Sequence, residues 1–316
     1  MKIKNLNLFF TFLIVALISA CTTKTTQNAA VAKDAKKEIA GSEKSLLWEI
    51  TGKDLKQPSY LYGTIHMIPK ADYFLTPATQ KAFEASKKVV FEINMKDMNN
   101  PMAMMSIMTK AMMPAGKTLK DFLNDTDYKL VQKKFDALGL PLKMLERIKP
   151  MFLSVMVGGD GAKMDGSSPE SSKSTSYEME FLQMGEKQKK EFGGLETVEF
   201  QMGIFDSIPY KAQADMLVKA VKNEGGGDDD FQKMIDMYKK QDIQAMSQML
   251  GSEKESDLAK YESMLITTRN INWVPKMGKL MAEKTVFFAV GAGHLGGEKG
   301  VLTLLQKEGY KVKAMN

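Results

Sequence analysis

The sequence predicts an α/β fold in which a central mixed sheet is built from strand–helix–strand units at both ends of the chain. Two apolar runs flank an amphipathic segment between residues 59 and 94, and the same order recurs between 285 and 315. The section between them, about 96–280, carries apolar residues at three- and four-residue spacing, which is typical of helices. We therefore expect one domain over 45–316 with a largely helical middle section.

The N-terminal unit begins with two apolar runs, "SLLWEIT" (45–51) and "SYLYGTIH" (59–66), separated by a polar segment. This order favours a hairpin entering a sheet. A helix should follow, with Thr76 as its N-cap and Pro77 as its first residue. "KVVFEIN" (88–94) is short, apolar and rich in β-branched residues, so it predicts a buried strand.

The C-terminal unit repeats this order. "TVFFAV" (285–290) predicts a buried strand, and "GEKGVLTLLQKEG" (297–309) predicts a helix that ends at Gly309. "YKVKAM" (310–315) alternates in polarity and predicts a final strand. The sheet should thus receive strands from both chain ends.

The first 20 residues have the layout of a secretory signal: Lys2 and Lys4, then an apolar core, then small residues before Cys21. The apolar core is short for a membrane span. The ending "ISAC" resembles a bacterial lipobox, which implies a lipid on Cys21, the one cysteine of the chain. Residues 21–44 are polar and Ala-rich, as expected of a flexible tether. We expect a signal peptide over 1–20 and a membrane partner through lipid on Cys21.

The charge pattern argues against nucleic acid as a partner. The formal net charge is +6, and the signal segment contributes two lysines to it. The other lysines are mixed with acids along the chain, whereas a nucleic-acid footprint requires clustered basic residues. The sequence leaves the oligomeric state open.

The chain has two histidines, and each follows a glycine by three positions. His66 lies in "YLYGTIHMIP" (60–69) and His294 in "FFAVGAGHLGG" (287–297). Both follow predicted strands at their carboxyl ends, and Glu92 lies near the carboxyl end of a third. Ligands of open α/β sheets bind outside these strand ends, so the three side chains form a candidate site.

Two imidazoles and a carboxylate allow two chemistries. They suit a divalent metal, because a two-His, one-carboxylate set leaves positions open for water and substrate. Alternatively, one histidine is a general base that Glu92 orients, without a metal. Glu92 could also form a structural ion pair with Arg269, because an unpaired buried charge is costly. The absence of a Gly-x-Ser-x-Gly motif argues against a serine hydrolase.

Five stretches spread over 45–316 resemble the TraB/GumN family, which includes the TIKI proteases and the PrgY-like pheromone-shutdown proteins. They are "YLYGTIHMIP", "VVFEIN", "GLETVEFQMGIFDSIP", "TTRNINWVPKM" and "FFAVGAGHLGGEKGVLTLLQKEGYKV". The resemblance implies a metal-dependent hydrolase acting on peptides or proteins, with manganese, cobalt or zinc as cofactor. It assigns His66, Glu92 and His294 as metal ligands and catalytic residues. Glu196 and Arg269 match recurrent polar positions and are further catalytic candidates.

Two other functions remain open at this point. One is a non-catalytic lipoprotein that binds a peptide or glycan in the same crevice, and the other is a metal-independent hydrolase with histidine as base. In each case the signal segment predicts a lipid-anchored protein of the bacterial cell envelope. Thr22 rather than Asp follows Cys21, which by resemblance to lipoprotein sorting favours the outer membrane or periplasm.

Methionines are frequent, with 26 in the chain and a dense group within 95–113. Thioether sulfur binds Cu(I), so a copper site is one interpretation. The preferred one is a flexible apolar surface that lines a peptide-binding wall or lid, because methionine adapts to varied partners.

Overall fold

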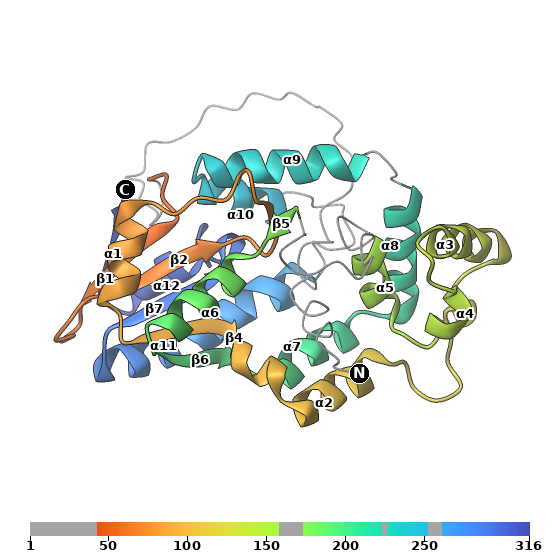
Figure 1. The fold of residues 1–316 in the computed structure, drawn as a ribbon, viewed down its shortest axis with the longest axis horizontal. Helices are drawn as coiled ribbons and strands as arrows, with labels where there is room; N and C mark the ends of the chain where they lie inside the picture. The colour runs from red at the N-terminus through yellow and green to blue at the C-terminus, as the bar shows by residue number, and fades with distance from the viewer. Residues whose placement is uncertain (1–42, 158–172, 223–225, 252–260) are drawn as a thin grey trace, which may run out of the picture.

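The computed structural model describes residues 43–157, 173–222, 226–251 and 261–316. The predicted signal segment, Cys21 and nearly all of the tether lie outside these ranges, so those predictions stay untested. Within the described residues, a mixed sheet packs between helices and adjoins a helical section (Figure 1). The predicted α/β class is therefore confirmed.

The main sheet has six strands in the order β6-β4-β7-β2-β1-β8. The inner strands are almost fully buried, as their β-branched and aromatic residues predict. The strands are β1 (Leu47–Gly52), β2 (Ser59–Thr64), β4 (Lys88–Ile93), β6 (Glu191–Glu196), β7 (Val286–Gly291) and β8 (Tyr310–Met315), and a separate ladder joins β3 (Ile68–Pro69) to β5 (Ser174–Thr175).

The strand directions place four carboxyl ends at one edge of the sheet. β6, β4, β7 and β2 are parallel, whereas β1 pairs antiparallel with both β2 and β8. The predicted hairpin is thus the β1–β2 pair. Tyr60 lies opposite Phe287, and Lys88 lies opposite Val286. Residues that follow β2, β4, β6 and β7 therefore gather at the same edge.

The edge strand β6 comes from the section predicted to be helical. Its sequence "EFGGLE" has two central glycines, and glycine weakens a strand pattern. The structure requires at least one of them: a Cβ on Gly194 would lie 2.5 Å from the backbone nitrogen of Asn94. The sheet therefore takes one strand from the middle of the chain as well as those from its two ends.

The helices fall into two groups (Figure 1). In that view α1 and α6 lie in front of the sheet and α11 and α12 behind it, while α3, α4, α5 and α8 form the helical section on the right. The bounds are α1 (Pro77–Ala85), α2 (Pro101–Ala111), α3 (Asp125–Ala137), α4 (Leu142–Leu145), α5 (Pro150–Val157), α6 (Tyr177–Lys187), α7 (Val198–Ile204), α8 (Tyr210–Lys222), α9 (Gly226–Lys239), α10 (Ile243–Gly251), α11 (Thr268–Glu283) and α12 (Val301–Lys307).

Helix ends follow the predicted caps. The hydroxyl of Thr76 accepts a hydrogen bond from the backbone nitrogen of Thr79 at 3.1 Å, and Pro77 opens α1. Gly309, with φ of +92°, follows α12 and allows the turn into β8.

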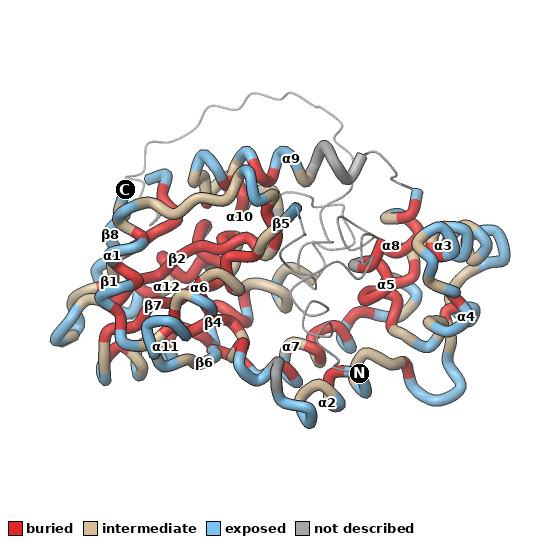
Figure 2. The backbone as a smooth tube through the Cα atoms, in the orientation of Figure 1, coloured by how far each residue is buried: buried red, intermediate tan, exposed pale blue. Residues whose placement is uncertain are grey.

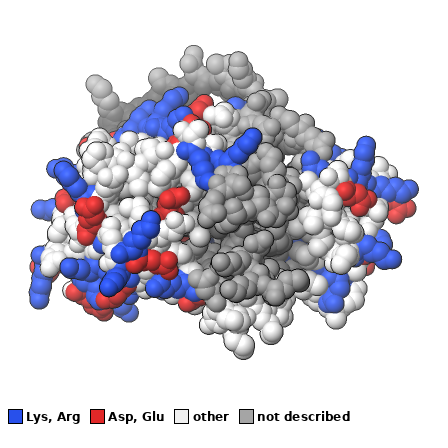
Figure 3. Space-filling model, viewed as in Figure 1, with Lys and Arg blue, Asp and Glu red and all other residues white. Residues whose placement is uncertain are grey.

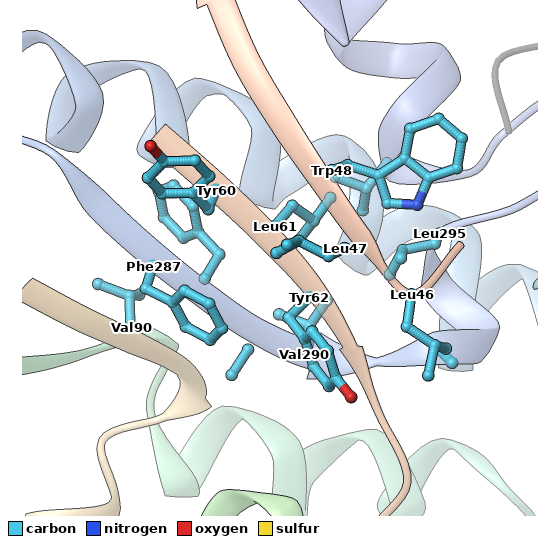
Figure 4. Close-up of a cluster of buried hydrophobic side chains, with 14 of the residues drawn as sticks. Leu46, Leu47, Trp48, Tyr60, Leu61, Tyr62, Val90, Phe287, Val290 and Leu295 are labelled. Atoms are coloured by element: carbon cyan, nitrogen blue, oxygen red, sulfur yellow. The ribbon is translucent and has the colours of Figure 1, made fainter. Parts of the chain in front are cut away.

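The largest core surrounds the sheet (Figure 4). On the face covered by α1 and α6, Phe287 contacts the rings of Phe83, Phe181 and Tyr62 at centroid distances of 5.0–6.0 Å. Figure 4 shows Tyr62 and Phe287 on neighbouring strands, pointing into the same layer. Aromatic packing of this kind stabilises the layer beyond the burial of area.

The helical section has cores of its own. One is formed mainly by α3, α4, α5 and α8, and a second by α2, α5 and α7. Figure 2 shows buried backbone running through both the sheet and this section, with exposed turns around α3 and α4.

Charged side chains of both signs lie on one face of the molecule. Lysines and acids lie side by side on the face drawn in Figure 3. Among the described residues, no helix is both long enough and apolar enough to cross a bilayer.

Candidate active site

The two histidines and Glu92 meet at the carboxyl edge of the sheet. His66 follows β2 by two residues, Glu92 is the penultimate residue of β4, and His294 lies in the turn after β7. Glu92 is 6% exposed and His294 2%. The three predicted strand ends therefore bring these three side chains to one place.

Gly291, at the end of β7, marks the point where they converge. A Cβ built on Gly291 would lie 3.3 Å from Glu92 Oε1, 3.6 Å from His294 Cδ2 and 4.0 Å from His66 Nε2. His294 Nε2 and Glu92 Oε1 are 3.8 Å apart. The two imidazoles and the carboxylate thus surround the position that a Gly291 side chain would occupy, and this position is called the space beside Gly291 below.

Arg269, on α11, ties this group to Glu196 at the end of β6. Its Nη2 donates to Glu92 Oε2 at 2.5 Å and to Glu196 Oε2 at 3.0 Å, and its Nε donates to both oxygens of Glu196 at 3.1 Å. Arg269 is 4% exposed. Planar guanidinium suits such multiple contacts with carboxylates.

The ion pair that the sequence offered as a structural alternative for Glu92 therefore exists, and it is part of the same cluster as the histidines. Arg269 Nη1 also lies 3.2 Å from His294 Nε2. The structure therefore connects Glu92, Glu196, Arg269 and His294 in one group, and His66 lies beside it with its Nε2 near Gly291.

Gln201, on α7, contacts both of the carboxylates that Arg269 binds, Glu92 and Glu196. Its Nε2 donates to Glu92 at 3.1 Å and to Glu196 at 3.2 Å. Gly291 donates its backbone N–H to the other oxygen of Glu92 at 2.9 Å. These contacts fix the rotamer of Glu92. Nothing in the sequence pattern singles out Gln201 beyond its place five residues after Glu196.

His66 has a carboxylate partner that sequence reasoning missed. Its Nδ1 lies 2.8 Å from Glu178 Oε1, at the start of α6. Its Nε2 is buried and has no hydrogen-bond partner. The ring therefore presents one satisfied nitrogen to α6 and one unsatisfied nitrogen to the space beside Gly291.

His294 has an amide partner. Its Nδ1 lies 2.6 Å from Asn270 Oδ1, and its ring packs against Trp273 at a centroid distance of 4.4 Å. Arg269 lies over the same indole, 4.9 Å from its centroid. Asn270 and Trp273 belong to the "TTRNINW" stretch of the resemblance, but their roles follow from contacts that the sequence does not show.

The two imidazoles differ in charge. Burial opposes protonation of His66, but Glu178 and Glu92 raise its pKa to about 9. Burial, together with Arg269, lowers the pKa of His294 to about 3. A general base works best with a pKa near the working pH. Neither histidine meets this condition at neutral pH in the metal-free state.

The pKa values of Glu92 and Glu178 are both lowered. Burial opposes ionisation of Glu92, but Arg269 and the two histidines hold its pKa far below the ordinary value. Burial likewise opposes ionisation of Glu178, and His66 lowers its pKa. Glu92 and Glu196 outnumber the one guanidinium between them, so this part of the site favours an added cation.

The donor set fits a divalent metal in kind. In the described part of the chain, no three His, Cys, Asp or Glu side chains already stand in the geometry of a metal site. However, His66 Nε2 is an unsatisfied buried atom facing the space at Gly291, and imidazole with carboxylate is a common ligand set for zinc, cobalt and manganese. Binding through His294 Nε2 would have to replace its contact with Arg269.

The methionine-rich segment forms the surface beside this edge. Met102, Met105 and Met108, all on α2, are 74%, 67% and 54% exposed. Their three-residue spacing puts them along one side of the helix. α2 packs against α7, which carries Gln201.

Comparisons with known proteins find several similar sequences. Metalloprotease TIKI2 of Danio rerio is 23% identical over 85% of this chain and 60% of its own length. Metalloproteases TIKI1 of Danio rerio and Homo sapiens are 24% and 23% identical, again over 85% of this chain and over 63% and 61% of their own lengths. The chain thus spans about three fifths of the curated relatives it matches. No solved structure matches.

The family-level comparison is broader. The model of the TraB/PrgY/gumN family matches residues 46–314, a range that includes all the residues of the site and all of the sheet except the last residue of β8. The chain belongs to the TraB/PrgY/gumN family.

Proposed function

We propose that the protein is a metal-dependent hydrolase that cleaves peptide bonds, with His66, Glu92 and His294 holding one divalent cation, Mn²⁺, Co²⁺ or Zn²⁺. The observation that carries this proposal is the unsatisfied His66 Nε2, which faces Glu92 and His294 across the space beside Gly291. Similarity to the TIKI metalloproteases supports the peptidase class.

A bound divalent cation supplies a water of lowered pKa and polarises the substrate carbonyl. The chain's own residues prepare the site for it. Arg269 and Gln201 hold the Glu92 carboxylate in one orientation, and Gly291 keeps the backbone clear of the reacting groups. Glu196 keeps Arg269 in place through three hydrogen bonds. In this account Arg269 and Glu196 order the ligand set.

The electrostatics favour this function over the metal-free alternative. A histidine base would need a pKa near neutral, whereas that of His66 is about 9 and that of His294 about 3. The excess of carboxylates over guanidinium instead favours an added cation, so we prefer the metallohydrolase.

We further propose that the protein acts at the bacterial cell envelope, anchored by lipid on Cys21, with the outer membrane or periplasm as its place. The signal segment supports this. Palmitate should label the wild-type protein in cells and fail to label Cys21→Ser. Equal labelling of both would reject the anchor.

The substrate should be a peptide or protein, and the exposed side of α2 should contact its apolar side chains. Met102, Met105 and Met108 form an adaptable apolar surface on a helix that packs against the helix of Gln201. Copper binding is not needed to explain their exposure.

A peptide-library digest with two matched glycine variants tests the proposal. Gly291→Ala places a methyl group in the space between the three ligands. Gly203→Ala, on α7, meets no atom within 4 Å, and alanine favours a helix. We expect cleavage by the wild type and Gly203→Ala when metal is supplied, loss with chelator, and no cleavage by Gly291→Ala.

Two outcomes would overturn the proposal. Cleavage that survives strong chelators would establish a metal-independent hydrolase. Tight peptide binding without cleavage, with each of the three metals supplied, would establish a binding lipoprotein.

A further inference from the structure

We propose that Glu178 and Asn270 are positioning residues that fix the ring tautomer and orientation of His66 and His294, so that both Nε2 atoms are presented to the space beside Gly291. The sequence singled out neither residue. The inference deepens the proposed function and rests on it for the metal, but the ring tautomers can be measured without any metal.

Glu178 leaves His66 one arrangement. A carboxylate only accepts hydrogen bonds, so the nitrogen that faces it, Nδ1, must carry a proton. In the neutral ring, Nε2 then keeps its lone pair. This is the usual way in which an outer carboxylate prepares a histidine to bind a metal.

The Glu178 carboxylate is itself held rigidly. Thr64 donates its hydroxyl to Glu178 Oε1 at 2.6 Å, and Ser176 donates to Oε2 at 2.8 Å. Ser176 is also the N-cap of α6, and the N-terminal end of a helix favours a negative charge. Thr64 ends β2, two residues before His66. The carboxylate therefore joins α6 to the strand that delivers the histidine.

Asn270 restricts His294 by a different route. Its Nδ2 donates to the backbone oxygens of His294 at 3.2 Å and Lys299 at 2.9 Å. Both are acceptors, so the amide cannot be reversed without losing two hydrogen bonds. Its Oδ1 must then face His294 Nδ1, which lies 2.6 Å away and must donate. Nε2 is again the nitrogen with the lone pair.

The two partners impose the same tautomer on the two rings, although Glu178 is a carboxylate and Asn270 a neutral amide. His66 and His294 come from strands β2 and β7, which pair directly, while Glu178 and Asn270 come from helices in the two layers that flank the sheet. The site is thus assembled by the strands and aligned from both helical layers.

Nitrogen-15 NMR of the imidazoles tests this directly, because the chain has only two histidines. The protein would be residues 22–316 without a histidine tag, labelled with ¹⁵N-histidine and free of metal. Recording at pH 10, one unit above the His66 pKa of about 9, makes the neutral form of that ring predominate. We expect the wild type to show a protonated Nδ1 and an unprotonated Nε2 in each ring.

The variants should separate the two rings. Glu178→Ala should convert His66 to a mixture of tautomers and leave His294 unchanged, and Asn270→Ala should do the reverse. Glu178→Gln and Asn270→Asp keep an acceptor oxygen and should retain more of the wild-type form. Glu180→Gln is the matched control, because Glu180 is also on α6 but pairs with Thr175 instead of a histidine.

Zinc titration gives the second readout. Loss of either positioning residue should weaken zinc binding about 10- to 100-fold, with Glu180→Gln unchanged. Folded Glu178→Ala and Asn270→Ala that keep wild-type tautomers in both rings would overturn the inference. If tautomers change as expected but the wild type binds none of the three metals, the proposed function fails while the positioning roles stand.

Discussion

The sheet and the helical section both have buried apolar cores, but they differ in how far their charged side chains and the partners of those side chains are buried. Around the sheet, Glu92, Glu178, Glu196 and Arg269 are all less than a tenth exposed and lie in one neighbourhood. In the helical section, Lys149 is buried and pairs with Asp206, whose side chain is 46% exposed. Among the described residues, the sheet edge therefore holds an ionic cluster largely shielded from water, whereas the buried lysine of the helical section pairs with a half-exposed aspartate.

This difference suggests that the sheet edge serves the chemistry of the site, whereas the helical section serves mainly stability. Buried ionic groups add little to stability compared with apolar residues of the same size, so such a cluster points to a chemical role. The helical section, with its apolar cores, is expected to contribute to stability and not to the chemistry of the site. The predictions below test that division, starting with the largest expected effect.

Core truncation should distinguish the two regions. Phe287 and Phe135 are both fully buried, the first on β7 and the second on α3. Phenylalanine-to-alanine changes in a core cost about 3–5 kcal/mol. We expect Phe287→Ala to lose both stability and bound metal, and Phe135→Ala to lose stability but keep the metal. Urea unfolding and metal analysis on the folded fraction check this.

Hydrogen exchange sharpens the same comparison. Phe135→Ala should speed exchange in α3, α5 and α8 and leave β2, β4 and β7 near the wild-type rate. Equal acceleration in both regions would show that they open as one unit, and the division would be wrong.

Removal of the buried guanidinium of Arg269 should lower the free energy of unfolding nearly as much as a phenylalanine-to-alanine change in the core. Arg269→Met leaves Glu92 and Glu196 without their cation, and breaking a buried pair in this way costs about 3–5 kcal/mol. Lys211→Met breaks a solvent-exposed pair with Asp215 and should cost about 0.5 kcal/mol or less. Thermal unfolding measures both changes. Similar shifts in Tm for the two variants would mean that the buried ion pairs of Arg269 matter no more for stability than the exposed pair of Lys211.

The pair of His66 and Glu178 should give a pH-dependent stability of intermediate size. The pKa of His66 is raised from 6.5 to about 9, so the folded state binds more protons than the unfolded state between these values and loses stability as pH rises. Glu178, with its pKa lowered, loses its contribution as pH falls below its ordinary value.

The reference for this measurement is His66→Asn, which lacks the titrating ring but still offers a donor to Glu178. Without metal, the difference in unfolding free energy between wild type and His66→Asn should be largest near pH 5.5–6.5 and shrink toward pH 9.5. A difference that grows with pH would contradict the sign.

Changes on the exposed side of α2 should have the smallest effect on stability. Met102→Gln and Met105→Gln alter exposed side chains and should change unfolding free energy by about 0.5 kcal/mol or less. If this surface binds substrate, KM should rise while kcat stays unchanged. Unchanged KM in the double variant would remove α2 from the binding surface.

Much of the sheet could be predicted from the sequence because its strands are short apolar runs bounded by turns. The positions of His66, Glu92 and His294 followed, since parallel strands end at one edge. β6 could not be predicted, because its central glycines hide the strand pattern and are explained only by a close approach to Asn94.

The partners of the site residues could not be predicted for a different reason. Glu178, Gln201 and Asn270 lie on helices where polar residues are common, and their partners in the site are 5 to 112 positions away in sequence. Only the three-dimensional arrangement distinguishes them from solvent-facing residues.

The most direct test of the central claim is the metal content of residues 22–316, purified without a chelator or histidine tag and measured by mass spectrometry. The comparison is His66→Asn/His294→Asn, because asparagine keeps a donor for Glu178 and Asn270 but lacks Nε2. We predict about one divalent metal per wild-type chain, as a single three-ligand site requires, and none in the double variant. Equal metal in both proteins, or none in either after loading with manganese, cobalt and zinc, would contradict the account.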